Sequence, residues 1–341
     1  MKKHKILVMR YRFVGDTILT VPFLRNLRKG YPESQIDMLV APVSGEVIEN
    51  CPYVDNFIYF DTTKKHRYEN SSVKKKTFWS YVKLLRKEKY DKVYVLKRSF
   101  SSALLAFLAG IPKRVGFDSE GRGFLLTKRV KYIENRHEAD CFLDVLEKDG
   151  LKVYDNYLEN WIDSKITEKI KPFLPQGKFA LVHATSGNVH KEWSEENFAG
   201  VVEFLSNEKD LIPVFLGTKS DSKKYERILS HIKTSLKKEP LNLCGKFDLR
   251  ESLAYTSFAD LMVGCDSGNL HMAASLHIPV VGVYGPMNWK KWYALGENNK
   301  ILHSDLPCIP CGLKKKCKFD YKCLKDISVE TVKKAINELI L

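Results

Sequence analysis

The sequence predicts an α/β protein made of two doubly wound halves, each a parallel sheet with helices on both faces. Three observations support this prediction: short apolar runs alternate with segments of helical spacing, the alternation fades between residues 151 and 177 and then restarts, and 341 residues suit two domains of ordinary size. We place the domains at residues 1–165 and 166–341, and treat the last helix as one that can pack back on the first domain.

The individual elements follow from hydrophobic spacing. In the first half, strands are predicted at 5–9, 36–40, 56–59 and 92–96, and helices at 17–29, 77–87, 101–109 and 138–148. In the second half, strands are predicted at 179–182, 211–216, 241–244, 261–264 and 280–284, and helices at 195–206, 249–257, 270–276 and 329–340. Because doubly wound folds bind ligands beyond the C-terminal ends of their strands, the loops after strands are the expected functional loops.

The charge balance points to an acidic partner. The formal net charge is +15, from 56 Lys and Arg against 41 Asp and Glu, with basic runs at 64–67 and 74–76. Such a surplus suits a nucleic acid, an anionic membrane surface or a phosphorylated substrate, although it is also typical of a lysine-rich proteome. No nucleic-acid-binding motif of known spacing is present, so we predict no nucleic-acid partner. The N-terminal apolar run is too short for a signal peptide, which favours a cytoplasmic location.

The most informative loop is Cys-Asp-Ser-Gly-Asn-Leu-His at residues 265–271, which follows a predicted strand and opens a helix. The free N–H groups and the dipole at a helix N-terminus favour a diphosphate there, and Gly268 permits close approach of the backbone. The alternative is that Asp266 or Ser267 only caps the helix.

Two further loops follow predicted strands. One contains Thr185 and Ser186 and continues to Lys191, which could reach a phosphate as a point charge. The other, at residues 10–16, ends on Asp16, which is either a helix N-cap or a general base for a sugar hydroxyl. A general base must be ionised, and the dipole of the following helix would favour the ionised form.

Four of the eight cysteines cluster near the C-terminus, at Cys308, Cys311, Cys317 and Cys323. Four thiolates within sixteen residues could hold a structural zinc, but only the first pair has C-x2-C spacing. Reduced thiols and disulfides therefore remain open alternatives.

Together, these motifs resemble the ADP-heptose:lipopolysaccharide heptosyltransferases, glycosyltransferase family nine, over nearly the whole chain. The resemblance is carried by residues 5–10 with Val-Gly-Asp at 14–16, by 103–110 with 114–117, by 266–273 with 280–286, and by the tail at 306–311 and 323–328. Arg12, where small polar residues are usual, and Ser-Gly-Asn at 267–269, where Thr-Gly-Pro is commoner, depart from the family pattern.

The resemblance implies a GT-B fold of two Rossmann-like domains with a cleft between them, and inverting, metal-independent transfer of heptose from ADP-heptose to a lipopolysaccharide inner-core acceptor. Another nucleotide sugar, or a GT-B-fold sugar-nucleotide epimerase, is the alternative. By position in the motifs, Asp16 is the implied base, and the implied donor-binding residues are Thr185, Ser186, Lys191, Asp266, Ser267, Gly268 and His271.

The acceptor that the resemblance implies is lipid-linked and acidic or phosphorylated, and we expect Arg10, Arg12, Lys97 and Arg98 to bind it. Such an acceptor places the enzyme in the cytoplasm as a peripheral protein of the anionic inner-membrane surface. No cofactor is expected for catalysis.

Overall fold

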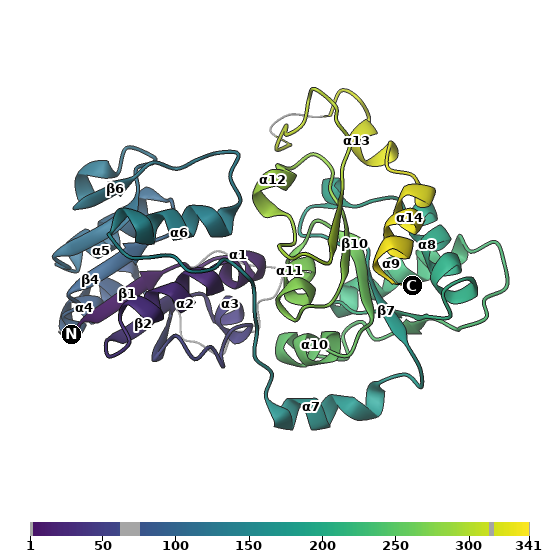
Figure 1. Ribbon diagram of the computed structural model, residues 1–341, viewed down its shortest axis with the longest axis horizontal. Helices are drawn as coiled ribbons and strands as arrows, with labels where there is room; N and C mark the ends of the chain where they lie inside the picture. The colour runs from purple at the N-terminus through teal and green to yellow at the C-terminus, as the bar shows by residue number, and fades with distance from the viewer. Residues whose placement is uncertain (1–2, 62–75, 314–316, 341) are drawn as a thin grey trace. The chain divides into compact units, whose positions relative to one another are not determined.

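The computed structural model describes residues 3–61, 76–313 and 317–340, and the chain divides into two compact units, Met1–Tyr157 and Leu158–Leu341 (Figure 1). The basic run at 64–67 and most of the run at 74–76 lie outside the described residues. Sequence analysis placed the division at 165/166, which falls inside helix α7 (Ser164–Ile170) of the second unit.

The first unit is built on a parallel sheet with strand order β3-β2-β1-β4-β5-β6 within the described residues. Its strands are β1 (Lys5–Met9), β2 (Gln35–Val40), β3 (Asn56–Tyr59), β4 (Lys92–Val95), β5 (Lys113–Phe117) and β6 (Lys128–Val130). The first four match the predicted strands: β1, β2 and β4 are largely buried runs, whereas β3 is a half-buried run at the edge of the sheet. β5 and β6 were not predicted, since both are short and begin with cations.

Helices cover both faces of this sheet. Leu7 and Met9 face the side of α4 (Phe78–Glu88) and α5 (Phe100–Leu108), which pack on each other. On the other face, α2 (Val21–Gly30) and α6 (Glu138–Lys148) pack together, and Phe23 of α2 meets Tyr94 of β4 edge to face. The short helix α3 (Pro42–Glu46) follows β2.

The predicted helix at 17–29 was wrong as a single element. The structure has α1 (Val14–Ile18) and then α2, separated at Leu19 and Thr20. Pro22 lacks an N–H group, so the hydrogen bond to the carbonyl of Ile18 that a continuous helix needs cannot form. Thr20 instead donates its hydroxyl to the carbonyl of Asp16 at 2.8 Å.

The second unit repeats the architecture with strand order β12-β11-β10-β7-β8-β9 among its described residues, again parallel. Its strands are β7 (Phe179–His183), β8 (Ile212–Phe215), β9 (Leu241–Asn242), β10 (Leu261–Cys265), β11 (Val280–Val283) and β12 (Asn299–Leu302). Only β12 was not predicted. The central β7, β10 and β11 are buried along their whole length, as expected for a sheet covered on both faces.

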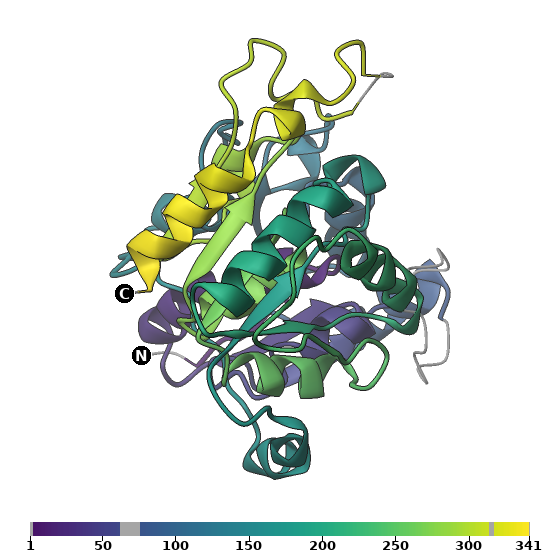
Figure 2. The ribbon, with the colours of Figure 1, turned by 90° about the vertical axis from the view of Figure 1, so that its right-hand side faces the viewer.

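One face of this sheet carries α8 (Glu195–Asn207), α9 (Ser222–Ser230) and α14 (Val329–Leu339), which share one apolar core. Figure 2 shows the yellow α14 beside α8, and the two helices are in contact. Buried Trp193 joins this layer by donating its indole N–H to the carbonyl of Ile327 at 3.0 Å. The final helix thus has its partners within the second unit.

The opposite face carries α10 (Leu249–Thr256) and α11 (Gly268–Ser275), with α7 packed on α10. The short helices α12 (Trp289–Trp292) and α13 (Lys322–Lys325) lie in the C-terminal part of the chain. In the part of the chain that the structure describes, no helix has the length and apolar character needed to cross a membrane.

Candidate active site

Asp16 lies at the C-terminal edge of the first sheet, in the first turn of α1, which follows β1 after a short loop. It is the third residue of the helix, so it is not the N-cap, which is Phe13 with a positive φ of 62°. Positive φ is uncommon outside glycine and often marks functional loops. The Asp16 carboxylate pairs with the Arg10 guanidinium at 2.5 Å, and their side chains are 15% and 5% exposed.

The protonation of Asp16 reflects two opposing effects. Burial raises the pKa of its carboxyl group, and the adjacent Arg10 charge opposes that rise. Glu138, the first residue of α6, adds a repulsive negative charge, and its carboxylate accepts a hydrogen bond from Tyr132 at 2.5 Å. Asp16 is therefore a carboxylate of raised basicity held by one strong cation, which is the character required of a general base.

Two of the predicted acceptor-binding cations, Arg10 and Lys97, act on the Asp16 carboxylate, and the other two, Arg12 and Arg98, lie near Lys97. The pKa of Lys97 is lowered to about 8, chiefly by burial and then by the charge of Arg10; Asp16 opposes this shift, and Arg12 and Arg98 add smaller contributions to it. The Arg98 guanidinium lies 4.0 Å from the ring centroid of Tyr132, and Arg12 is half-buried. An acidic ligand would relieve the mutual repulsion of these cations, so the geometry favours an anion here.

In the second unit, the loops after β7 and β10 lie side by side because these strands are neighbours. The Lys191 ammonium group pairs with the Asp266 carboxylate at 2.9 Å, with side chains 18% and 9% exposed. Ser267 is the N-cap of α11, but its side chain makes no capping hydrogen bond, and within the described residues its buried Oγ has no hydrogen-bond partner. A hydroxyl in that state at a helix N-terminus is available to a ligand.

The other predicted donor-binding residues surround this loop. Ser186 donates its hydroxyl to the carbonyl of Asp266 at 3.2 Å, which joins the two loops directly. Thr185 and His271 are buried, and Gly268 begins α11. Seven residues predicted from three separate stretches of sequence are thus brought together at the C-terminal edge of the second sheet.

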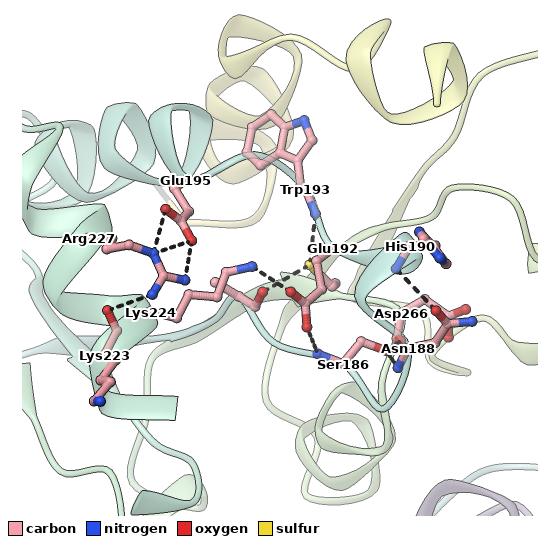
Figure 3. A network of polar contacts seen from close by, with 12 residues as sticks. Ser186, Asn188, His190, Glu192, Trp193, Glu195, Lys223, Lys224, Arg227 and Asp266 are labelled. Atoms are coloured by element: carbon pink, nitrogen blue, oxygen red, sulfur yellow. Dashed lines mark hydrogen bonds and ion pairs between the residues drawn. The ribbon is translucent and has the colours of Figure 1, made fainter. Parts of the chain in front are cut away.

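The residues that hold the loop after β7 in place were not predicted from the sequence. The Glu192 carboxylate accepts a hydrogen bond from the Ser186 N–H group at 2.7 Å and pairs with the Lys224 ammonium of α9 at 2.6 Å (Figure 3). Glu192 thereby closes the turn that carries Lys191 and anchors it to α9. Lys224 is 32 residues away from Glu192 in the sequence, and no local motif predicts that they form a pair.

The cysteine segment contacts the same turn. Tyr321 stacks on His190, the neighbour of Lys191, with ring centroids 5.0 Å apart, and a 2.6 Å hydrogen bond joins its hydroxyl to His190 Nδ1. The Cys317 sulfur accepts from the Tyr321 N–H group at 3.2 Å, and the Cys311 thiol is 3.8 Å from the carbonyl of Pro286. The segment that carries the four thiols thus helps to position the Lys191 turn.

The four thiols do not form a metal cage in this structure. Cys308, Cys311, Cys317 and Cys323 are all free, so among the three alternatives the structure has the reduced thiols. The described residues contain no group of three or more His, Cys, Asp or Glu side chains placed to hold a metal ion. Burial raises the pKa of Cys323 to about 11, with smaller contributions from the other three thiols, so that thiol is protonated at neutral pH. Four thiolates suit zinc chemically, but this arrangement does not fit the ion.

Two doubly wound units, one with a buried carboxylate among cations and the other with a lysine beside a helix N-terminus, are the arrangement expected of a transferase that handles a nucleotide-linked substrate. The family model for glycosyltransferase family 9 (heptosyltransferase) matches residues 78–322. The chain therefore belongs to glycosyltransferase family 9.

Individual proteins agree with this assignment. Lipopolysaccharide heptosyltransferase 2 of Escherichia coli is 26% identical, with 99% of both chains covered. The crystal structure of a family 9 glycosyltransferase from Veillonella parvula has a TM-score of 0.82 and 26% identity, covering 98% of this chain and 97% of that one. An Escherichia coli heptosyltransferase solved with ADP has the same fold, at a TM-score of 0.73 and 18% identity, over 98% of this chain and 99% of that one.

Proposed function

We propose that this glycosyltransferase moves a heptose from ADP-heptose to the inner core of a lipopolysaccharide acceptor. The proposal depends on two charged sites, one at the C-terminal edge of each sheet. In the second unit, Lys191 pairs with Asp266 at the N-terminus of α11. In the first unit, Asp16 lies beside Arg10 and Lys97. A nucleotide diphosphate suits the Lys191 site and an acidic acceptor the Asp16 site. Family membership and the ADP-bound relative favour ADP-heptose as the donor.

The donor diphosphate would bind at the start of α11. Lys191 would supply a positive charge, and the backbone N–H groups of α11 with the Ser267 hydroxyl would supply hydrogen bonds. Thr185, Ser186, Gly268 and His271 would complete the site around it. When the bond to the sugar breaks, negative charge grows on the leaving diphosphate, and Lys191 with the helix dipole would stabilise it without a metal ion.

The acceptor would bind beside Asp16 in the first unit. Arg12, Lys97 and Arg98 would pair with its phosphate or acidic sugar groups, while Arg10 stays on Asp16. The acceptor hydroxyl would attack the anomeric carbon and pass its proton to the Asp16 carboxylate, and ADP would leave with the electron pair of the broken bond. Because the attacking oxygen enters opposite the leaving group, the configuration at the anomeric carbon would invert.

A lipid-linked acceptor requires the enzyme to work at a membrane surface. We infer that the protein acts on the cytoplasmic side of the inner membrane as a peripheral protein. The net charge of +15 supports this inference, because basic residues near anionic lipid each contribute about 1 kcal/mol of attraction.

Incubation with ADP-heptose and a lipopolysaccharide acceptor lacking heptose tests the proposal, with mass spectrometry of the acceptor as the readout. We expect the acceptor to gain the mass of one heptosyl residue only when enzyme and donor are both present. Conversion of the nucleotide sugar without any acceptor would instead identify an epimerase. Transfer from a GDP- or UDP-sugar, with none from ADP-heptose, would overturn the donor assignment.

A further inference from the structure

Helix α5 carries an apolar face toward solvent. Phe100, Leu104, Phe107 and Leu108 are spaced at i, i+4, i+7 and i+8, which places them on one side of the helix. Phe100 and Phe107 are 39% and 47% exposed, and the two leucines are half-buried. The opposite side, with Leu105 and Ala106, packs into the core of the first unit. A surface helix normally presents polar residues to water, so an apolar outer face indicates a partner.

The apolar face continues beyond the helix. Phe124, in the short turn at Gly123–Leu125, is 68% exposed, and its ring centroid lies 6.2 Å from that of Phe100. Because Phe124 contacts the first residue of α5, the exposed aromatic rings form one continuous strip rather than scattered single residues. A contiguous apolar strip of this kind is more informative than isolated exposed side chains.

Cations line one side of this strip. The outer positions of α4, the helix packed against α5, are Trp79, Lys83, Arg86 and Lys87, all exposed and again spaced at i, i+4, i+7 and i+8. Arg86 donates a 2.6 Å hydrogen bond to the carbonyl of Leu108, which joins the two helices.

The charges nearest the strip are of both signs. The Arg114 guanidinium lies 5.3 Å from the ring centroid of Phe107. Two carboxylates are close, and both are engaged: Glu120 accepts from the N–H of Phe100 at 3.0 Å, and Glu88 pairs with Lys5 at 2.5 Å. Glu120 keeps its charge, and Lys83, Arg86 and Lys87 of α4 together with Arg114 leave the balance on this side of the unit positive.

We propose that this aromatic–basic face, made of Phe100, Leu104, Phe107, Leu108 and Phe124 with Trp79, Lys83, Arg86 and Lys87, docks on an anionic phospholipid bilayer. The aromatic and leucine side chains would enter the boundary between headgroups and acyl chains, where amphipathic helices bind. The cations of α4 would remain among the headgroups, with their aliphatic stems along the apolar boundary. Trp79 belongs to the residue type most favoured at that depth.

Charge selects the bilayer over a second copy of the chain as the occupant. Pairing two copies through this face would bring the α4 cations of one near those of the other, in a protein whose net charge is already +15. Anionic headgroups would neutralise the same cations. Helix α5 begins at Phe100, only three residues after Lys97, so docking would bring the edge of the sheet that carries Lys97 close to the headgroups. The importance of bringing Lys97 close to the headgroups rests on the proposed function, whereas the docking of the aromatic–basic face does not.

Vesicle flotation of the full-length protein tests the proposal, with phosphatidylcholine vesicles compared with vesicles that also contain phosphatidylglycerol. We expect binding to the anionic vesicles that weakens as salt is raised. The double variant Phe107→Ser/Phe124→Ser should bind about tenfold or more weakly, because each ring loses its burial in lipid. The matched control is Phe258→Ser/Phe319→Ser, which removes rings of 38% and 60% exposure from the second unit and should bind like the unaltered protein.

The charge contribution has its own variants. Lys83→Glu/Lys87→Glu should lose binding to anionic vesicles, whereas Lys233→Glu/Lys334→Glu, with the same change in net charge on exposed positions of the second unit, should lose much less. All four double variants alter exposed side chains, and circular dichroism melting checks that each is folded.

Three results would overturn the proposal. The unaltered protein could fail to float with anionic vesicles at low salt. The Phe107→Ser/Phe124→Ser variant could float as well as the unaltered protein. Sedimentation could show a dimer that this variant dissolves, without vesicle binding, which would make the face an interface between copies. Transfer to a delipidated, soluble acceptor should be unchanged in the Phe107→Ser/Phe124→Ser and Lys83→Glu/Lys87→Glu variants. If neither the unaltered protein nor any variant transferred heptose, while the unaltered protein still floated with anionic vesicles, the proposed function would be wrong and the docking proposal would stand.

Discussion

The Asp16–Arg10 pair is the residue-scale centre of the proposed chemistry. Burial raises the pKa of the Asp16 carboxyl group, and the adjacent Arg10 charge opposes that rise and favours the ionised form that a general base requires. A residue that only capped a helix would need neither the burial nor the cation. The first-turn position of Asp16 inside α1 also removes the simple N-cap interpretation.

Replacing Asp16 tests its role. Asp16→Asn keeps the shape but cannot accept the proton, so we expect kcat to fall by about 10²–10⁴-fold. The affinity for ADP, measured by calorimetry, should be unchanged because the donor residues lie in the second unit. Near-normal turnover in the variant would exclude Asp16 as the base, provided that circular dichroism shows the same fold.

Lys97 gives the pH dependence a definite sign. Its pKa of about 8 means that its positive charge is present below that pH and is lost as the pH rises through it. At pH 9, roughly nine-tenths of Lys97 is neutral. We therefore expect the KM for an acidic acceptor to rise several-fold between pH 7 and pH 9. In Lys97→Arg the rise should disappear, because arginine stays charged, and an unchanged rise would assign it to another group.

At the scale of elements, the loop between β7 and α8 depends on Glu192. Its side chain is 15% exposed and that of Lys224 is 13% exposed, so their ion pair is largely shielded from water. Nearby Glu195 pairs with Arg227, which is 57% exposed (Figure 3). Shielded pairs lose more when one partner is removed, since an unpaired charge stays behind.

These two carboxylates give a matched comparison. Glu192→Gln should weaken ADP binding by about tenfold, because the Ser186 turn and Lys191 lose their anchor. Glu195→Gln should change ADP binding by less than about twofold. Isothermal titration of both variants is the measurement, and equal effects would show that the Glu192–Lys224 pair does not position the donor loop.

Much of the architecture could be predicted because buried parallel strands are apolar runs. β1, β4, β7 and β10 stand out for that reason. β5 was missed because it begins with Lys113 and Arg114. Arg114 is partly buried and donates to the carbonyl of Leu125 at 2.6 Å, a contact that only the folded chain creates. β12 is half-buried along its length and gives a similarly weak signal.

The candidate site also contains residues that could be predicted from the sequence and residues that could not. Asp16, Lys191 and the Asp266 loop could be found because each follows a strand in a doubly wound fold. Glu192 with Lys224, and His190 with Tyr321, could not, because these partners are 32 and 131 residues apart. Local spacing carries no information about such pairs, which form only when neighbouring loops are brought together.

At the scale of the whole molecule, the position of the boundary between the two units is set by polar contacts. These contacts attach residues 154–157 to helix α2 of the first unit. Asn26 of α2 accepts from the Tyr154 N–H group at 2.8 Å, and Arg25 pairs with Asp155 and donates to the Tyr157 carbonyl at 2.8 Å. Residues 154–157 therefore belong to the first unit although their sequence has no helical or strand pattern. The following residues then begin the second unit at Leu158.

The central claim is that the second unit binds the diphosphate of an ADP-sugar through Lys191 and the N-terminus of α11. Calorimetric titration with ADP, GDP and UDP tests it most directly, using the unaltered protein, Lys191→Ala, and Lys233→Ala as an exposed control in the same unit. We expect selective binding of ADP that is lost or weakened by about tenfold or more in Lys191→Ala and kept in the control. Binding of UDP or GDP in preference to ADP, or ADP binding indifferent to Lys191, would contradict it.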